Sequence, residues 1–224
     1  MEKNKTRTRY ITLGAVVVIA IMLISTIALI LYSQTQSNLL YPTEVQNYEG
    51  ENLSSISDVY ENAIHGTQFI NESTYRLTVD GLVDEPKAYT YDEVSNNFTS
   101  YHKVVTIYCV EGWSAKILWQ GVLVRDLLNA SGLNNTAKVV IFHAQDGYTT
   151  SLPVTYFYEN DILLAYKMNN LTIPIERGFP FELVAESQYG YKWIKWITQI
   201  ELSSNADYLG YWESRGYPND ATLR

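Results

Sequence analysis

The 224-residue sequence contains a single cysteine, Cys109, and only three histidines. One cysteine excludes an intrachain disulfide framework. His65, His102 and His143 are too scattered to give the ligand spacing of a structural zinc site. The sequence also lacks a Gly-x-Gly-x-x-Gly fingerprint after a strand, a P-loop and a Gly-x-Ser-x-Gly nucleophile elbow. The usual signatures of dinucleotide binding, nucleotide hydrolysis and serine hydrolases are therefore missing.

Basic residues are fewer than acidic ones, 16 against 24, and the formal net charge is −8. Four of the bases and one acid precede residue 10, which leaves 12 bases against 23 acids in the rest of the chain. Such an acidic body repels nucleic acid and anionic lipid head groups, so we expect no nucleic-acid partner. The sequence is 46% hydrophobic and 13% aromatic, which is typical of one folded domain with a full core.

Charged residues are absent between Arg9 and Glu44, and Tyr10 to Tyr32 is an apolar run. As a helix this run would span about 34 Å, enough to cross a bilayer. Basic residues flank it on the N-terminal side only, so the positive-inside bias predicts a cytoplasmic tail over residues 1–9, a transmembrane anchor over 10–32 and a domain outside the cell membrane. A cleaved secretory signal is the alternative, but the run is long and no small-x-small cleavage site follows it.

Residues 33–58 are polar, with Ser, Gln, Asn and Pro42, and are interpreted as a tether that leads to a folded domain over 59–224. Asn-x-Ser/Thr triplets begin at seven asparagines, where chance alone would give about 2.5. This excess indicates a glycosylated outer surface. Six of the triplets follow the apolar run, at Asn52, Asn71, Asn97, Asn129, Asn134 and Asn170.

The region after residue 75 mixes strand and helix patterns. Residues 75–83 alternate as a strand does, and a capping box from Thr90 to Glu93 predicts a short helix through Asn97. Asn169-Asn170 suits the turn of a hairpin. Helical spacing predicts a helix over 121–130, and further strands are predicted over 139–143, 148–152, 162–168, 181–185 and 197–202. With no internal repeat and no second core, the fold class is α+β in one domain.

The segment around Cys109 resembles a strand that ends at a pocket. Residues 104–108 are β-branched, apolar or aromatic, whereas Gly112, Trp113 and Trp119 after the cysteine are more typical of a pocket wall than of a continuing strand. A thiolate is a soft ligand for a transition metal and also a nucleophile. The alternatives are a buried cysteine that acts as a small hydrophobe and, less favoured, a thiol–imidazole pair with His143.

Two lysines stand among aromatic residues in an otherwise acidic domain, Lys192 and Lys195, just after Gly190. A glycine allows a ligand to approach the backbone closely, and two ammonium groups can neutralise a phosphate, so this segment is a candidate anion pocket. Arg177 upstream can join it. The alternative is a solvated turn in which the lysine stems cover aromatic faces.

Several ordered segments resemble the molybdenum-cofactor domain of the sulfite oxidase family. The resemblance covers about Tyr75 to Tyr217 and is carried by the combination of its motifs in one order. The end of the chain is similar to that of prokaryotic members, which include the catalytic subunit of the methionine-sulfoxide reductase system. The segments are Cys109-Val-Glu-Gly-Trp113, Trp119-Gln-Gly-Val-Leu-Val-Arg-Asp-Leu-Leu128, Asp161 to Asn169, Gly178-Phe-Pro180, Gly190-x-Lys-x-x-Lys-Trp196 and Gly210 to Tyr217.

The resemblance implies a sulfite-oxidase-type fold of mixed β-sheets and short helices that binds molybdopterin, with molybdenum or tungsten as the metal. It implies that Cys109 is the thiolate ligand of that metal, that Tyr148 is an active-site residue near the equatorial oxo ligand, and that Trp119 lines the substrate approach. Simple packing is the alternative role for Tyr148. The cofactor-binding residues implied beside Cys109 are His65, Arg177, Gly190, Lys192 and Lys195.

The chain also departs from the family pattern. Sulfite oxidases place arginines around their dianionic substrate, but Cys109 is followed by Val-Glu-Gly, and the family's Gly-Phe-Pro-x-Arg ends here in Glu182. The family's Arg-Asn-His element corresponds to residues 63–68, which keep His65, and Arg177 replaces a histidine at a phosphate-contacting position. Without those cations sulfite is a poor substrate, and a neutral S-oxide or N-oxide suits the pocket better.

The sequence therefore predicts a membrane-anchored, extracytoplasmic, molybdopterin-dependent oxidoreductase that transfers an oxygen atom to or from a small substrate. It contains no haem motif, so we expect a separate electron-transfer partner, either a membrane cytochrome or a soluble carrier. A cofactor-free surface binding or adhesion module on the same fold is the alternative from another functional class.

Overall fold

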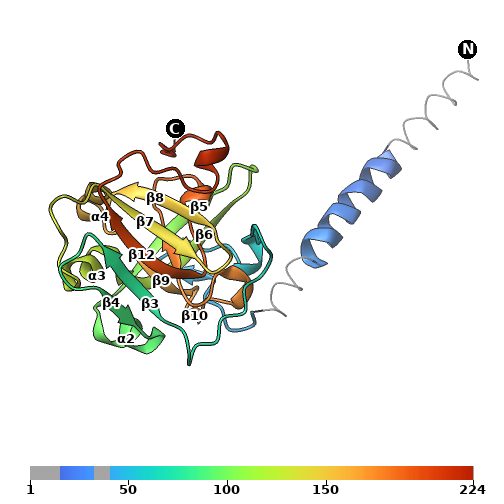
Figure 1. Cartoon of the computed structure of the whole chain (residues 1–224). Helices are drawn as coiled ribbons and strands as arrows, with labels where there is room; N and C mark the ends of the chain where they lie inside the picture. The colour runs from blue at the N-terminus through green and yellow to red at the C-terminus, as the bar shows by residue number, and fades with distance from the viewer. Residues whose placement is uncertain (1–15, 33–40, 224) are drawn as a thin grey trace, which may run out of the picture. The chain divides into compact units, whose positions relative to one another are not determined.

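The structure is a computed structural model that describes residues 16–32 and 41–223 and divides into two units, Met1–Pro42 and Thr43–Arg224. The described part of the first unit includes a helix over residues 16–32, and all its side chains are exposed (Figure 1). Within the described ranges, none of the helices combines the length and the apolar character needed to cross a membrane. Residues 10–15 of the predicted anchor and the predicted tail 1–9 lie outside the described residues.

The first large sheet of the second unit contains the strands on both sides of Cys109. Its order is β10-β9-β6-β5, β11 pairs with the same β9, and every pairing is antiparallel. The strands β5 and β6 form a long hairpin in which Tyr108 lies opposite Ser114. The bounds are β5 (Ser100–Tyr108), β6 (Ser114–Leu123), β9 (Leu163–Met168), β10 (Leu171–Thr172) and β11 (Glu182–Val184).

The second large sheet has the order β4-β3-β12-β7-β8, and four of its arrows, β3, β12, β7 and β8, lie side by side in Figure 1. The pair of β3 with β12 is parallel, and the others are antiparallel. Both sheets contribute residues without exposed surface to the core, such as Val79, Ile117 and Leu163. The bounds are β3 (Leu77–Gly81), β4 (Lys87–Tyr89), β7 (Val139–Ala144), β8 (Thr149–Pro153) and β12 (Ile197–Ser203).

The helices of this unit are short. The predicted capping box is confirmed: the Thr90 hydroxyl accepts from the Glu93 N–H, and the Glu93 carboxylate accepts from the Thr90 N–H. Mixed sheets with short helices confirm the α+β prediction. The elements are α2 (Tyr91–Asn97), α3 (Val124–Ala130), α4 (Val154–Glu159), and the 3-10 turns η1 (Ile56–Asp58), η2 (Ile175–Arg177), η3 (Gly190–Lys192) and η4 (Glu213–Arg215).

Two predictions about the segment after Cys109 need correction. Trp113 lines a pocket, as predicted, but Trp119 lies in residues 114–123, which continue as the strand β6, and the helix begins at Val124 rather than at Gly121. Gly121 must be in the strand because β9 passes directly over it: a Cβ there would lie 2.2 Å from the Leu164 carbonyl oxygen. Val122 is a fully buried residue of the strand β6. As an apolar residue it contributed to the spacing that predicted a helix, although it is not in one.

The predicted tether is also shorter than expected, because residues 43–58 belong to the folded unit. They include the two-stranded sheet of β1 (Asn47–Tyr48) and β2 (Glu51–Asn52) and the turn η1. The Ser54 N–H donates to the Lys116 carbonyl of β6 over 2.8 Å. Polar composition misled the prediction, because these polar groups are used in hydrogen bonds to the domain. Residues 33–40 lie outside the described residues.

Glu44 fastens this segment to the domain. Its carboxylate accepts from the Ile56 N–H at 2.8 Å, the Ser55 hydroxyl at 2.6 Å and the Asn169 amide at 3.2 Å. We expect Glu44→Ala to lower the free energy of unfolding by about 1.5–3 kcal/mol, because buried donors lose a charged acceptor. Urea denaturation measures this. Glu49→Ala, at an exposed position of the same segment, is the control, and equal effects of the two variants would contradict the assignment.

Candidate active site

A pocket of about 380 Å³ opens at the loop that carries Cys109. It is built from segments far apart in the sequence: residues 59–64, the β5–β6 loop, the turn before β8, residues 190–196 and two C-terminal aromatic residues, Trp212 and Tyr217. Its volume is that of a small-molecule site. Three residues singled out from the sequence, Tyr148, Gly190 and Lys195, line it together with Cys109.

Cys109 is held by the backbone of its own loop. Its N–H donates to the Trp113 carbonyl at 2.9 Å, and the Gly112 N–H donates to the Cys109 carbonyl at 3.1 Å. The sulfur faces the Glu111 N–H at 3.5 Å and the Asn62 amide nitrogen at 3.7 Å. Burial raises the pKa of the Cys109 thiol, and the Glu111 N–H opposes this shift. A bound metal ion reverses that balance, because a coordinating thiol is deprotonated.

Asn62 and Glu111 are site residues that the sequence reasoning missed. The Asn62 amide donates to Glu111 Oε2 at 3.2 Å, so an amide, a carboxylate and the sulfur form one cluster. Glu111 stands two residues after Cys109, and its position in the same loop was a usable signal. Asn62 had no such signal, because it lies 47 residues from Cys109 and reaches the site only through the tertiary fold.

Gly190 lies beside the cysteine, as its predicted role at the cofactor requires. A Cβ at this position would be 3.5 Å from the Cys109 Cα and 3.9 Å from its Cβ. An isolated parallel bridge between Tyr108 and Tyr189 brings the two segments together. Gly190 therefore lies against the backbone of the Cys109 loop.

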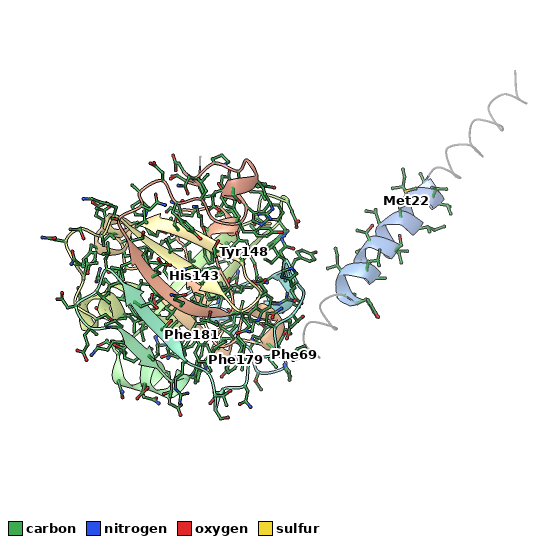
Figure 2. The ribbon with its side chains drawn as sticks, in the orientation of Figure 1. Met22, Phe69, His143, Tyr148, Phe179 and Phe181 are labelled. Atoms are coloured by element: carbon green, nitrogen blue, oxygen red, sulfur yellow. The ribbon has the colours of Figure 1, made fainter. Side chains whose placement is uncertain are left out.

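Tyr148 lines the pocket at the start of β8, and its hydroxyl donates to the Tyr191 carbonyl at 2.5 Å. Burial raises the pKa of Tyr148, and the nearby Glu213 carboxylate raises it further, so the phenol is a neutral donor at physiological pH. His143, on the adjoining strand β7 in Figure 2, does not line the pocket and instead pairs with Glu201 at 2.9 Å. The thiol–imidazole alternative for His143 is therefore wrong.

The two predicted phosphate-binding lysines have different environments. Lys195 lines the pocket, with its ammonium 4.4 Å from the Trp196 ring centroid. Lys192 has no exposed surface and does not line the pocket. Its ammonium donates to the Ser151 carbonyl at 2.9 Å and to Asn219 at 3.0 Å, and it forms an ion pair with Glu213. The prediction that Lys192 faces the cofactor is corrected here, because its ammonium group is neutralised by the buried Glu213 carboxylate.

Lys195 interacts electrostatically with Glu182 and Arg177; Glu182 lines the pocket, whereas Arg177, predicted to bind the cofactor, does not. Glu182 lines the pocket and is 2% exposed, and its Oε2 atom is buried without a hydrogen-bond partner, as is the Arg177 Nε. Burial raises the pKa of Glu182 to about 8, although Lys195 and then Arg177 oppose the shift. Gly178 provides clearance, because a Cβ there would lie 3.0 Å from the Lys195 Cβ. Orphaned polar atoms beside a pocket are typical of a site for a polar ligand.

Two further predicted residues lie behind or beside the pocket rather than on its surface. Trp119, predicted to line the substrate approach, is fully buried and donates its indole N–H to the Val105 carbonyl at 3.3 Å. Its ring contacts Trp193, which does line the pocket, with the centroids 5.6 Å apart. Trp119 is inside because β6 carries it into the core. His65 does not line the pocket either, and its Nδ1 is 2.7 Å from the Asp146 carbonyl oxygen.

Comparison with known proteins identifies the family. The model of the oxidoreductase molybdopterin binding domain matches residues 65–212. The chain belongs to this family. Its members bind molybdopterin and are oxidoreductases, so the enzyme is favoured over the cofactor-free module.

Two bacterial relatives are similar over most of the domain. The chain is 37% identical over 144 residues to the "Uncharacterized oxidoreductase YuiH" of Bacillus subtilis (strain 168), which covers 64% of this chain and 72% of the relative. It is 35% identical over 159 residues to the "Putative protein-methionine-sulfoxide reductase subunit YedZ1" of Azospira oryzae, covering 70% of this chain and 60% of the relative. A nitrate reductase of Phaseolus vulgaris is 25% identical, and the chain spans 21% of its length.

The crystal structure of the sulfane dehydrogenase SoxCD from Paracoccus pantotrophus has the same fold. The TM-score is 0.60 with 21% sequence identity, over 63% of this chain and 41% of that one. The mixed sheets and short helices described above are thus a sulfite-oxidase-type fold.

The residues of the pocket fit molybdopterin. Cys109 offers a soft sulfur donor and Lys195 a cation for a phosphate, and the Glu182 Oε2 atom of the pocket lining is buried without a hydrogen-bond partner in the described part of the chain. Cys109 would hold the metal and Lys195 the phosphate. When bound, the cofactor would supply redox chemistry at its metal, and the chain would supply ligation, anchoring and electrostatics.

Proposed function

We propose that this oxidoreductase transfers an oxygen atom to or from a small, neutral S-oxide or N-oxide, and that sulfite is a poor substrate. In the reductive direction a sulfoxide takes up two electrons and two protons and leaves as a sulfide and water. The name of the Azospira oryzae relative, a methionine-sulfoxide reductase subunit, supports this substrate class.

The charge of the pocket carries the proposal. Four acidic side chains line it, and Lys195 is the one basic residue among the described residues that do so. Once Lys195 is used by the cofactor phosphate, a dianion such as sulfite meets the like charges of Glu61, Glu111 and Asp146, whereas a neutral S–O or N–O dipole meets donors and aromatic rings. The acids are Glu61, Glu111, Asp146 and Glu182, and the aromatic lining includes Tyr60, Trp113, Trp193, Trp212 and Tyr217.

The test measures the turnover of molybdenum-loaded protein with a reduced viologen dye as electron donor and dimethyl sulfoxide, methionine sulfoxide or trimethylamine N-oxide as acceptor. We expect kcat/KM for at least one of these oxides to exceed that for sulfite oxidation, assayed with ferricyanide, by 100-fold or more (about 2.7 kcal/mol). Cys109→Ser is the background control. Sulfite oxidation that is faster than reduction of every oxide would overturn the proposal.

We also propose that residues 10–32 anchor the enzyme in the cell membrane with residues 1–9 in the cytoplasm and the domain outside. The support is the uncharged apolar run with basic residues on one side only. Glycosylation of the outer surface belongs to this proposal, and the asparagines at 52, 71, 97, 129 and 170 are exposed. We further propose that a separate partner, either a membrane cytochrome or a soluble carrier, delivers electrons to the enzyme. The word "subunit" in the name of the Azospira oryzae relative supports such a partner.

Fractionation of cells that express the full chain tests the anchor. We expect the protein in the carbonate-washed membrane fraction, with the domain degraded by protease added to intact spheroplasts. A variant that begins at residue 41 should be recovered in the soluble fraction. Recovery of the full chain in the soluble fraction, or protection of its domain from added protease, would refute the proposed location.

A further inference from the structure

Glu182 is a buried acid that lines the pocket, and one of its carboxyl oxygens has no hydrogen-bond partner among the described residues. It is the first residue of β11, where it pairs with Ala165 of β9. Only 2% of its surface is exposed, and its Oε2 atom has no partner in the described part of the chain. A buried carboxyl group without a partner is costly, so a ligand with a complementary polar group is expected there.

Two cations face this acid without pairing with it. Lys195 and Arg177 both act electrostatically on Glu182, but within residues 16–32 and 41–223 no ion pair joins either of them to it. Two more acids act electrostatically on Lys195: Glu61 from the loop after η1 and Asp146 from the β7–β8 turn. Lys195 attracts an anion to this end of the pocket, and an ionised Glu182 would repel the same anion.

The conflict disappears if the acid carries a proton. We infer that Glu182 is protonated when molybdopterin is bound, and that it donates a hydrogen bond to the cofactor phosphate beside Lys195, so that the enzyme loses its cofactor more readily as the pH rises. A neutral carboxyl group is both donor and acceptor, whereas the carboxylate only accepts. This inference depends on cofactor binding and not on the proposed substrate.

The direction of the pH dependence follows from linkage. Burial raises the pKa of Glu182 to about 8 in the empty pocket, and an adjacent phosphate dianion raises that pKa further. Below about pH 8 the acid is already neutral and binding takes up no proton. Above it, binding must reload a proton, so cofactor affinity falls by up to about tenfold per pH unit. The phosphate is a dianion throughout this range, because its second ionisation is near pH 6.

The experiment uses the molybdenum-loaded full chain. It is incubated at pH 7, 8, 9 and 9.5 and desalted at timed intervals, and the molybdenum that remains per chain is measured by elemental mass spectrometry. Circular dichroism at each pH reports on folding. We expect the release rate to be constant from pH 7 to 8 and to rise with pH once Glu182 ionises in the complex, which occurs above pH 8 because the phosphate raises its pKa there.

Two variants separate the acid from the lysine. Glu182→Gln has a neutral donor at every pH, so its release should no longer depend on pH above 8 and should match that of the original chain at pH 7. Lys195→Arg keeps a cation that does not titrate, and its release should retain the original pH dependence. This control matters because burial lowers the pKa of Lys195.

Three results would overturn the inference. The first is release from the original folded chain that does not change with pH. The second is an unchanged pH dependence in Glu182→Gln together with its loss in Lys195→Arg, which would assign the titration to the lysine. The third is weaker retention by Glu182→Gln at pH 7, which would mean that an ionised Glu182 accepts a hydrogen bond from the cofactor.

Discussion

Cys109→Ser is expected to lose its bound molybdenum and to reduce turnover by at least about 100-fold. Even the loss of a residue that only hydrogen-bonds to a metal ligand typically lowers metal affinity or activity about 10–100-fold. Cys109 is the one cysteine of the chain, and it lines the pocket. A serine hydroxyl is a hard, poorly acidic ligand and does not replace a thiolate at a high-valent metal. Molybdenum per chain and viologen-dependent turnover measure the two effects.

Tyr108→Phe is the matched control for this prediction. Tyr108 precedes the cysteine in β5, its side chain is 45% exposed, and it does not line the pocket. Its substitution should leave metal content and turnover close to those of the original chain. Full molybdenum content and full activity in Cys109→Ser would show that the sulfur is not a metal ligand, and the assignment of the site would fail.

Lys192→Ala is expected to lower the free energy of unfolding by about 3–5 kcal/mol, because it leaves the Glu213 carboxylate buried without its counter-charge. Both side chains of this pair are fully buried. Thr150 also donates to Glu213, at 2.8 Å, but a hydroxyl does not neutralise a carboxylate. For a domain of this size such a loss corresponds to a fall in Tm of roughly 10 °C. Thermal unfolding of the variant followed by circular dichroism measures it.

Two further variants test whether the loss comes from the ion pair. Lys116→Ala removes one partner of an exposed pair with Glu51, whose side chains are 43% and 54% exposed, and should change Tm little. The double variant Lys192→Ala with Glu213→Ala removes both buried charges, so its loss should be clearly smaller than the sum of the single losses. Additive losses would mean that the two residues stabilise the fold independently.

Features of the fold that depend on neighbours in the sequence were predicted correctly. The capping box places the start of α2, because its two hydrogen bonds join residues three apart. The Asn169-Asn170 turn joins β9 to β10, and both residues have positive φ, as a two-residue hairpin turn requires. The strands β7 and β12 were predicted from the apolar character of their own residues.

Features that depend on distant partners were missed. Glu44 reaches across 125 residues to Asn169, so a polar segment that looked like a tether is part of the domain. The backbone of β9 lies against Gly121, which keeps that position in a strand despite its helical spacing. The resemblance implied that Trp119 lines the pocket, but the sequence does not show which face of β6 carries this side chain. In the structure it lies in the core.

The sequence by itself determined the family and the cofactor, and it predicted Cys109 as the metal ligand and a cation for the phosphate. These follow from side-chain chemistry and ordered motifs, which are local properties. Only the tertiary structure decided which lysine meets the pocket, because Lys192 and Lys195 are three residues apart and only Lys192 is paired with the buried Glu213. It alone brought Asn62 to the sulfur and left Glu182 unpartnered beside two cations, since contacts between distant segments exist only once the chain has folded.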